Sequence, residues 1–315
     1  MARFIVRRLF SMAIVMIVIS ILTFLLFEAI PNGNPAFRLA GRNATSAEIH
    51  QIEVKYGFNK PIYDQYLRTM QNIFTGKAVS YTQGYNVDSQ LWQDLPVTLW
   101  LAFGASILWL GSAVTIGTIG AIRQGKFADR FLNVLAMIGV SMPPYFLGAV
   151  LLYYLSYKAG IFPISNYVSL GQNPGEWFLH LFLPWVTLAV LYVGFYSRVL
   201  RSNILDTLNE DYVRTARAKG LSPRRVLVGH VLRNSLIPII SLWGLDFAAI
   251  IGGGAILIES LFGLNGIGNL TFQSIGRLDV VVILVVVILT SFAIVLLAAI
   301  IDILYAYLDP RIRLS

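Results

Sequence analysis

Residues 120–127 come closest in this chain to a motif that performs chemistry. Gly120, Gly125 and Lys126 have the spacing that begins a phosphate-binding loop, G-x-x-x-x-G-K. Such a loop continues with a Ser or Thr whose hydroxyl binds magnesium, but Phe127 stands at that position. The segment also follows an apolar stretch rather than a strand. We therefore interpret the match as coincidence and expect no nucleotide site in this chain.

The other reactive residue types form no catalytic or metal-binding set. The chain has no cysteine, which excludes disulfides, thiolate nucleophiles and cysteine-based zinc sites. Its three histidines, His50, His180 and His230, are far apart and lack the spacing of metal ligands. No combination of Ser, His and carboxylate suggests hydrolysis. We predict no catalytic residue, no metal site and no cofactor in this chain.

The composition is that of a membrane protein. Of the 315 residues, 57% are apolar and 13% are charged, whereas about a quarter of a soluble domain is charged. Too little polar surface remains to keep such a chain in water, so an ordinary cytosolic enzyme is nearly excluded. The formal charge of +8 then needs an explanation other than nucleic-acid binding.

A helix needs about twenty apolar residues to cross a bilayer. Six stretches of this chain are apolar enough to do so. They run roughly over residues 9–30, 97–122, 131–157, 178–197, 236–258 and 280–302. In hydrocarbon the backbone amides must bond within each segment, so all six must be helical. The first stretch has too long an uncharged run for a signal peptide, and we expect it to be retained. The predicted fold class is all-α integral membrane, with six transmembrane helices.

The distribution of basic residues predicts the orientation. Of the 24 Lys and Arg residues, sixteen lie at the N-terminus, in loops 123–130 and 198–235, and in the C-terminal tail. The other eight lie in segments 31–96, 158–177 and 259–279. By the positive-inside rule both termini and the 198–235 loop are cytoplasmic. We therefore divide the chain into the N-terminus with the first helix (1–30), a small external lobe (31–96), with helices expected near 46–56 and 61–73, and a transmembrane core (97–315).

The 198–235 loop has the pattern of two short helices joined by a sharp corner. Residues 207–210, Thr-Leu-Asn-Glu, fit a capping box. Four apolar positions recur at helical spacing: Leu205, Leu208, Tyr212 and Ala216. Glu210 and Arg214 can pair at i,i+4. Gly220 suits a left-handed helix end, and Ser222 with Pro223 suits a new start. These residues alone allow a second interpretation, a surface helix in the lipid headgroups.

Two parts of this loop resemble a known family. Residues 210–221 (EDYVRTARAKGL) and 233–238 (RNSLIP) are similar to the coupling loop of bacterial ABC-importer permeases. The resemblance is closest to the dipeptide/oligopeptide/nickel family, in the branch that resembles dipeptide permease B. Of the general motif E-A-A-x-x-x-G, Ala216 and Gly220 are present, while Arg214 and Thr215 replace the first two residues. Residues 56–66, 95–99 and 258–268 also resemble that family, although Asn265 stands where proline is usual and 76–80 departs from its pattern.

The resemblance implies the fold, the role and the partners. It implies a type I ABC-importer permease that forms half of a pathway for short peptides in the bacterial cytoplasmic membrane. The implied partners are a second homologous permease, two ATPase subunits that hold ATP and Mg, and an external substrate-binding protein. It also implies which residues contact the ATPase: Leu205, Leu208, Glu210, Tyr212, Arg214, Ala216, Arg217, Lys219, Gly220 and Leu221.

The residues that line the substrate pathway are predicted from single positions rather than from a motif. We expect Asp246, Gly252, Gly253 and Glu259 along it. Asp246 is a carboxylate well inside an apolar segment, which is expensive unless it faces water or a partner; a pathway role and a structural hydrogen bond both fit. Ala248, Ala249 and the two glycines form small-x-x-x-small pairs for close helix packing. Pro143 and Pro144 imply a kink.

The conformation of residues 263–268 and two rival functions are left open by the sequence. Closely spaced glycines at 263–268 predict either a tight hairpin dipping into the bundle or an ordinary turn. A secondary transporter would need coupling charges within its helices, for which Asp246 is the main support. A membrane scaffold or anchor would not need the organised 198–235 loop. We take the ATP-driven permease as the first hypothesis.

Overall fold

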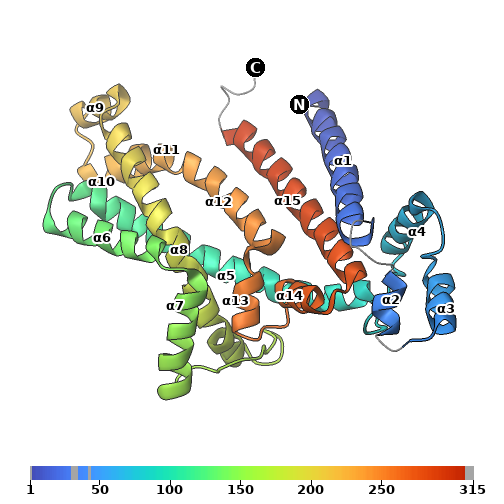
Figure 1. Cartoon of the computed structure of the whole chain (residues 1–315). Coiled ribbons are helices and arrows are strands. Elements are labelled where there is room, and N and C mark those ends of the chain that lie inside the picture. Colours follow the sequence, from blue (N-terminus) through green and yellow to red (C-terminus); the bar gives the residue numbers. More distant parts are fainter. Residues whose placement is uncertain (1, 30–34, 42–43, 309–315) are drawn as a thin grey trace. The chain divides into compact units, whose positions relative to one another are not determined.

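The computed structural model describes residues 2–29, 35–41 and 44–308 as helices joined by turns (Figure 1). Within these ranges the extended pairing is limited to one antiparallel bridge, between Val79 and Asn86. The predicted all-α class is therefore confirmed. The predicted end of the first segment at residue 30, and Arg42, Arg311 and Arg313 of the charge argument, lie outside the described residues.

Among the described residues, five helical stretches are long and apolar enough to span a membrane. Four contain α1 (Ala2–Phe24), α5 (Val87–Ile122), α8 (Pro174–Leu208) and α15 (Val280–Leu308). The fifth is α12 (Ile237–Ala249), continued by a π-helical turn to Gly254. A bent pair, α6 (Phe127–Ser141) and the stretch from α7 (Pro144–Leu151) to Lys158, gives the sixth span if its two halves cross together.

The third apolar stretch, predicted over 131–157 with a kink or break at Pro143 and Pro144, is a bent pair of helices. Its halves meet at 98° (Figure 1). Pro143 is extended (ψ 131°) and Pro144 occupies the first turn of α7. A residue before proline is pushed out of the helical region, so two consecutive prolines end one helix and begin the next. The kink expected at these prolines is confirmed.

Two other helices begin earlier than the apolar segments predicted. Helix α5 begins at Val87 rather than near residue 97, and the side-chain oxygen of Asn86 accepts a hydrogen bond from the Ser89 amide at 2.9 Å. Helix α8 begins at Pro174, where Asn173 accepts from the amides of residues 175 and 176. Hydropathy marks only the apolar part of each helix, whereas caps mark its start.

The chain forms two compact units. The first comprises residues 1–97 and 266–296. It contains the four short helices α2 (Pro35–Ala40), α3 (Ser46–Tyr56), α4 (Ile62–Phe74) and α14 (Ile267–Arg277). Helices α3 and α4 match the two expected near 46–56 and 61–73, whereas the sequence did not predict α14. Val87, Leu91, Ile267 and Val282 are among the residues of its apolar core.

Polar contacts fix the ends of this first unit's helices. Thr45 caps α3: its amide donates to Glu48 at 2.7 Å, and its hydroxyl accepts from the Glu48 amide. The Thr45 amide and then its hydroxyl hold the pKa of Glu48 below the usual value. At the start of α15, buried Asp279 accepts hydrogen bonds from the hydroxyls of Ser80 and Thr82, the latter at 2.6 Å. This ties loop 77–82 to α15.

The second unit comprises residues 98–265 and 297–315. Besides the long helices and the bent pair α6–α7, its described part contains four short helices: α9 (Asp211–Ala218), α10 (Pro223–Val226), α11 (Arg233–Ser235) and α13 (Ile256–Leu261). Its helices approach most closely at small residues. A Cβ on Gly194 would lie 2.3 Å from the Ala136 carbonyl oxygen, and one on Gly244 would lie 2.2 Å from the Ile301 side chain. One close approach on α12 is therefore at Gly244, and close packing at the small-residue pairs of 248–253 stays a prediction.

Candidate functional site

The 198–235 region folds into a hairpin of short helices at one end of α8 (Figure 1). Helix α8 ends at Leu208, Asn209 closes it, and Glu210 is extended (ψ 145°), so that α9 starts in a new direction at Asp211. Helix α10 follows, and a π-helical stretch (Leu227–Leu232) leads to α11. The predicted helix–corner–helix arrangement of this loop is present.

The first predicted helix of the hairpin needs correction. Leu205 and Leu208 are on α8, and Tyr212 and Ala216 are on α9, so the four residues do not form one stripe. The capping box at 207–210 is also absent, since α9 starts after Glu210 without a side-chain cap. Helix α8 continues beyond its apolar part to Leu208, so Thr207 and Leu208 lie within α8 and not at the start of a new helix. A capping pattern in the sequence does not fix a helix end to within one or two residues.

Helix α9 has one buried and one exposed face. Val213 and Ala216 are buried, with 0% and 6% of their surface exposed, and they lie one turn apart. Tyr212 is 40% exposed, and Arg214 pairs with Asp211 at 3.8 Å rather than with Glu210. The predicted stripe grouped Tyr212 with Ala216, whereas the buried face of α9 pairs Ala216 with Val213; the spacing from Val213 to Ala216 was the available signal. The exposed face carries a tyrosine and several charges, and is available to a partner.

Gly220 makes the corner after α9. Its φ is +79°, and the amides of Gly220 and Leu221 bond back to the carbonyls of Arg217 and Ala216 at 2.9 and 3.4 Å. The bond from Leu221, spanning six residues, is the pattern of a Schellman helix end, which needs a left-handed residue. Ser222 is extended and Pro223 starts α10. The predicted left-handed cap and proline start are both confirmed.

Hydrogen bonds anchor the hairpin to α8. The buried Ser235 hydroxyl lies 3.1 Å from the Thr207 hydroxyl and 3.2 Å from the Asn203 carbonyl oxygen, both on α8. The Asn234 amide group donates to the Tyr212 hydroxyl at 2.6 Å. These contacts join α11, α9 and α8. They come from the 233–238 segment that the resemblance singled out.

A partly buried ion pair that the sequence did not predict joins α8 to α6. The Arg201 guanidinium on α8 donates two hydrogen bonds of 2.8 Å to the Asp129 carboxylate on α6. Asp129 also accepts from the Gly125 amide and the Asn133 side chain, both at 2.9 Å. Bidentate pairs of this kind fix orientation as well as distance. A single carboxylate among the basic residues of loop 123–130 was the available signal.

The G-x-x-x-x-G-K spacing at residues 120–126 comes from the turn between α5 and α6. Residues 120–122 end α5, Gly125 is left-handed (φ +76°), and Lys126 precedes the first turn of α6. A helix rather than a strand leads into this turn, and the Gly125 amide, which a phosphate would need, already donates to Asp129. The motif glycine at 125 serves a helix–helix corner.

Asp246 makes a structural hydrogen bond. The Tyr196 hydroxyl on α8 donates to the Asp246 carboxylate on α12 at 2.5 Å, and the Tyr196 side chain is fully buried. The Tyr196 ring also packs near those of Trp109 and Tyr192. Of the two roles left open by the sequence, the interhelical hydrogen bond is present, and a pathway role stays a prediction.

The other pathway candidates lie where α12 ends. Gly252 is half-buried, and Gly253 breaks the helix with φ +132°, a conformation that L side chains rarely adopt. Glu259 on α13 has 0% of its surface exposed and accepts a hydrogen bond from the Thr98 hydroxyl at 2.6 Å. Glu259 thus lies in the unit's interior in this conformation, and its assignment to the pathway stays a prediction. Residues 262–266 form a turn, closed by Gly263 (φ +60°), before α14.

Comparison with known proteins identifies the family. A model of the binding-protein-dependent transport system inner membrane component matches residues 113–314. The N-terminal model of the same transport-system membrane component matches residues 1–102. The chain belongs to this family. The permease is thus a transport component of an ABC importer, and in this family ATP hydrolysis is carried out by separate subunits.

Curated relatives align with the permease over nearly its whole length. A probable peptide ABC transporter permease from Sinorhizobium fredii is 38% identical, with 99% of this chain and 100% of the relative covered. The oligopeptide transport system permease protein AppB of Bacillus subtilis is 35% identical over 99% and 100%. A probable D,D-dipeptide transport system permease of Escherichia coli is 33% identical over 97% and 96%.

Solved structures support the fold. The permease is similar to a chain of the methionine ABC transporter MetNI in two crystal forms, with TM-scores of 0.52 and 0.54 at 15% and 17% identity. Each match covers 70% of this chain and 96% of the other. The predicted ABC-importer permease fold is therefore confirmed. The family model and the apolar helices show that the permease is a multi-pass membrane protein. The secondary-transporter and scaffold hypotheses are not supported.

Proposed function

We propose that this permease forms half of the membrane pathway of an ATP-driven importer for short peptides. The relatives named for peptides, oligopeptides and a D,D-dipeptide support this substrate class. A second homologous permease would supply the other half of the pathway. An external binding protein would deliver the peptide, and two ATPase subunits would bind ATP and Mg. The permease itself catalyses no covalent step.

The proposed location is the bacterial cytoplasmic membrane, with a defined orientation. Both termini and the 198–235 hairpin face the cytoplasm, and the lobe formed by residues 31–96 faces outward. Support comes from the two-to-one distribution of basic residues between the proposed inner and outer segments. Reporter fusions after Gln71 and after Leu221 test it: they should give opposite signals, and equal signals would contradict the orientation.

The observation that carries the coupling proposal is the two-faced helix α9. Val213 and Ala216 hold it against its own unit, and its exposed face presents Tyr212 and charged residues outward. The hydrogen bonds of Ser235 and Asn234 connect it to α8, one of the long spanning helices. A helix anchored on one face and free on the other can dock in an ATPase groove and transmit its movement to the membrane.

Reconstitution tests the whole proposal. The permease, co-expressed with the genes of its associated subunits, is placed in liposomes with ATP inside and binding protein outside. ATP-dependent uptake of a labelled tripeptide is the expected result. Transport of peptides without any ATPase subunit would refute the ATP-driven mechanism, and ATP-dependent transport of a non-peptide solute alone would refute the substrate class.

A further inference from the structure

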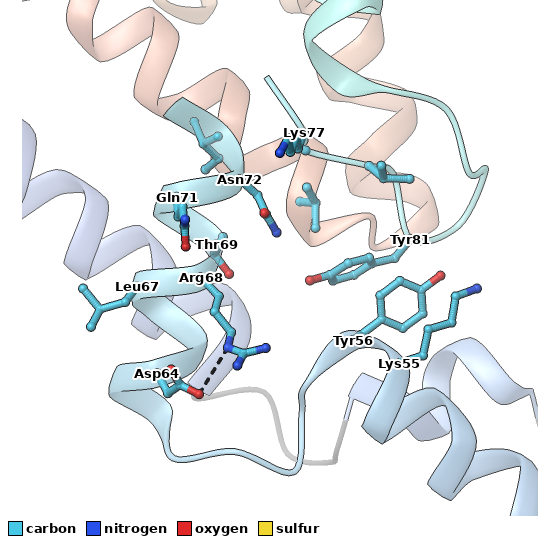
Figure 2. Close-up of a pocket in the computed structure, with 14 residues that line it drawn as sticks. Lys55, Tyr56, Asp64, Leu67, Arg68, Thr69, Gln71, Asn72, Lys77 and Tyr81 are labelled. Atoms are coloured by element: carbon cyan, nitrogen blue, oxygen red, sulfur yellow. Dashed lines mark ion pairs between the residues drawn. The ribbon is translucent and has the colours of Figure 1, made fainter. Parts of the chain in front are cut away.

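A polar pocket in the first unit has no role in the coupling mechanism. It lies between α4, the end of α3 and loop 77–81, with a volume of about 580 Å³ (Figure 2). Pockets of about 300–1,000 Å³ are the size that small ligands occupy. The charged groups that line it are Lys55, Arg68, Lys77 and Asp64. Three cations thus face one carboxylate.

The single carboxylate is already neutralised. Asp64 pairs with Nε of Arg68 at 3.2 Å and with Lys60, outside the pocket, at 3.6 Å. Figure 2 shows the Arg68 guanidinium directed from α4 into the pocket, toward Tyr56 and Tyr81. No carboxylate lies within 4 Å of the Lys77 ammonium among the residues that the structure describes. The pocket therefore carries excess positive charge.

The uncharged lining completes the recognition chemistry. The rings of Tyr56 and Tyr81 lie 4.6 Å apart and form one wall, and Lys55 sits over the Tyr56 ring at 5.1 Å. Gln71 and Asn72 on α4 contribute side-chain amides, which can donate to and accept from a peptide bond. Aromatic rings beside cations and amides suit a ligand that has a carboxylate, amide bonds and an apolar side chain.

We propose that this pocket binds a carboxylate presented on the outer side of the membrane. The proposal rests on the proposed peptide import and on the outward orientation of the lobe. Two sources can supply the carboxylate: a free peptide in transit, or an acidic side chain of the external binding protein. The pocket residues belong to one compact unit, and the contacts of Asp279 with Ser80 and Thr82 hold loop 77–82 in place.

The experiment uses the complete transporter complex in nanodiscs of neutral lipid. The probes are labelled trialanine, its C-terminal amide, and the ligand-free binding protein. The test variant combines Arg68→Gln with Lys77→Gln, and each single variant is measured alongside. Arg277→Gln is the matched control, because it removes the same charge from the same compact unit but neither lines the pocket nor pairs with Asp64. All these side chains are partly exposed, so the amount of assembled complex should not change.

If the carboxylate comes from a free peptide, wild-type complex binds trialanine about tenfold more tightly than its amide, because two charge-assisted contacts are lost with the amide. The double variant binds both equally, and the control keeps the difference. If the carboxylate comes from the binding protein, binding of that protein weakens about tenfold in the double variant only. Unchanged values in both arms overturn the pocket proposal.

The two proposals fail differently. Absence of ATP-dependent trialanine uptake by the wild-type complex would refute peptide import, while the binding-protein arm would still test the pocket. Normal uptake, with both binding arms unaffected by the double variant, would refute the pocket alone.

Discussion

Replacement of Gly220 tests the coupling hairpin most directly. This residue has φ +79°, and an added Cβ would meet no heavy atom within 4 Å apart from its chain neighbours, in the part of the chain that the structure describes. A substitution therefore costs backbone energy alone, with no steric clash. A left-handed residue with a side chain costs roughly 1–2 kcal/mol, and a β-branched one more.

This backbone cost is small compared with the stability of the whole membrane protein, but it is large for the local conformation of the turn at Gly220. About 1.4 kcal/mol is a factor of ten in an equilibrium constant, so Gly220→Val lowers the population of the observed corner by about tenfold or more. Insertion of the apolar helices is not affected. We expect normal membrane levels, ATPase association weakened about tenfold, and loss of peptide uptake. Gly220→Asn should lose less, because Asn tolerates the left-handed region better.

The assay measures co-purification of the ATPase, stimulated ATP hydrolysis and uptake in the same membranes. Gly160→Val is the matched control: its φ is +64°, and its added Cβ also meets no described heavy atom within 4 Å, but it lies outside the hairpin. A second control is Gly171 in the same 158–177 segment. Wild-type uptake by Gly220→Val would refute the reasoning, and α9 would then be a surface helix in the headgroups.

Three further predictions follow from the contacts of single side chains. Asp129→Ala removes the partner of the partly exposed Arg201 guanidinium and should lower the unfolding free energy by about 1.5–3 kcal/mol, measured by denaturant titration in detergent. Replacing both residues with apolar ones should cost less than this. Tyr196→Phe removes the hydrogen bond to Asp246 and should cost about 1–3 kcal/mol in the same measurement. Burial and two nearby carboxylates raise the pKa of Tyr85 above its usual value near 10, so stability should fall as pH rises above about 10, and Tyr85→Phe should remove that loss.

Each of these has an outcome that contradicts it. Equal stability of the Asp129 single variant and wild type would show that the ion pair does not hold α6 to α8. A Tyr196→Phe permease of unchanged stability but lost uptake would favour a pathway role for Asp246. An alkaline transition that is the same with and without Tyr85 would show that another group titrates. The sign for Tyr85 is fixed by linkage: the unfolded tyrosine releases its proton first, so rising pH favours unfolding.

The sequence by itself determined the class of protein and most of its local structure. Long apolar runs can only be helices in hydrocarbon, so the spanning segments follow from composition. The caps at Thr45, Gly220 and Pro223 are local, because each depends on backbone groups within a few residues of it. The break at Pro143 and Pro144 is local for the same reason. The short motifs of the hairpin were sufficient to suggest the family.

Only the tertiary structure decided which side chains meet across the sequence. Asp129 and Arg201 are 72 positions apart, and Tyr196 and Asp246 are 50 apart. Nothing in a local pattern states such a pairing, since it depends on how the helices pack. Helix ends such as Leu208 were missed for a related reason: contacts with the rest of the unit extend α8 beyond its apolar stretch and turn Val213, rather than Tyr212, inward. Helical periodicity limits which residues share a face, but packing selects the face that is buried.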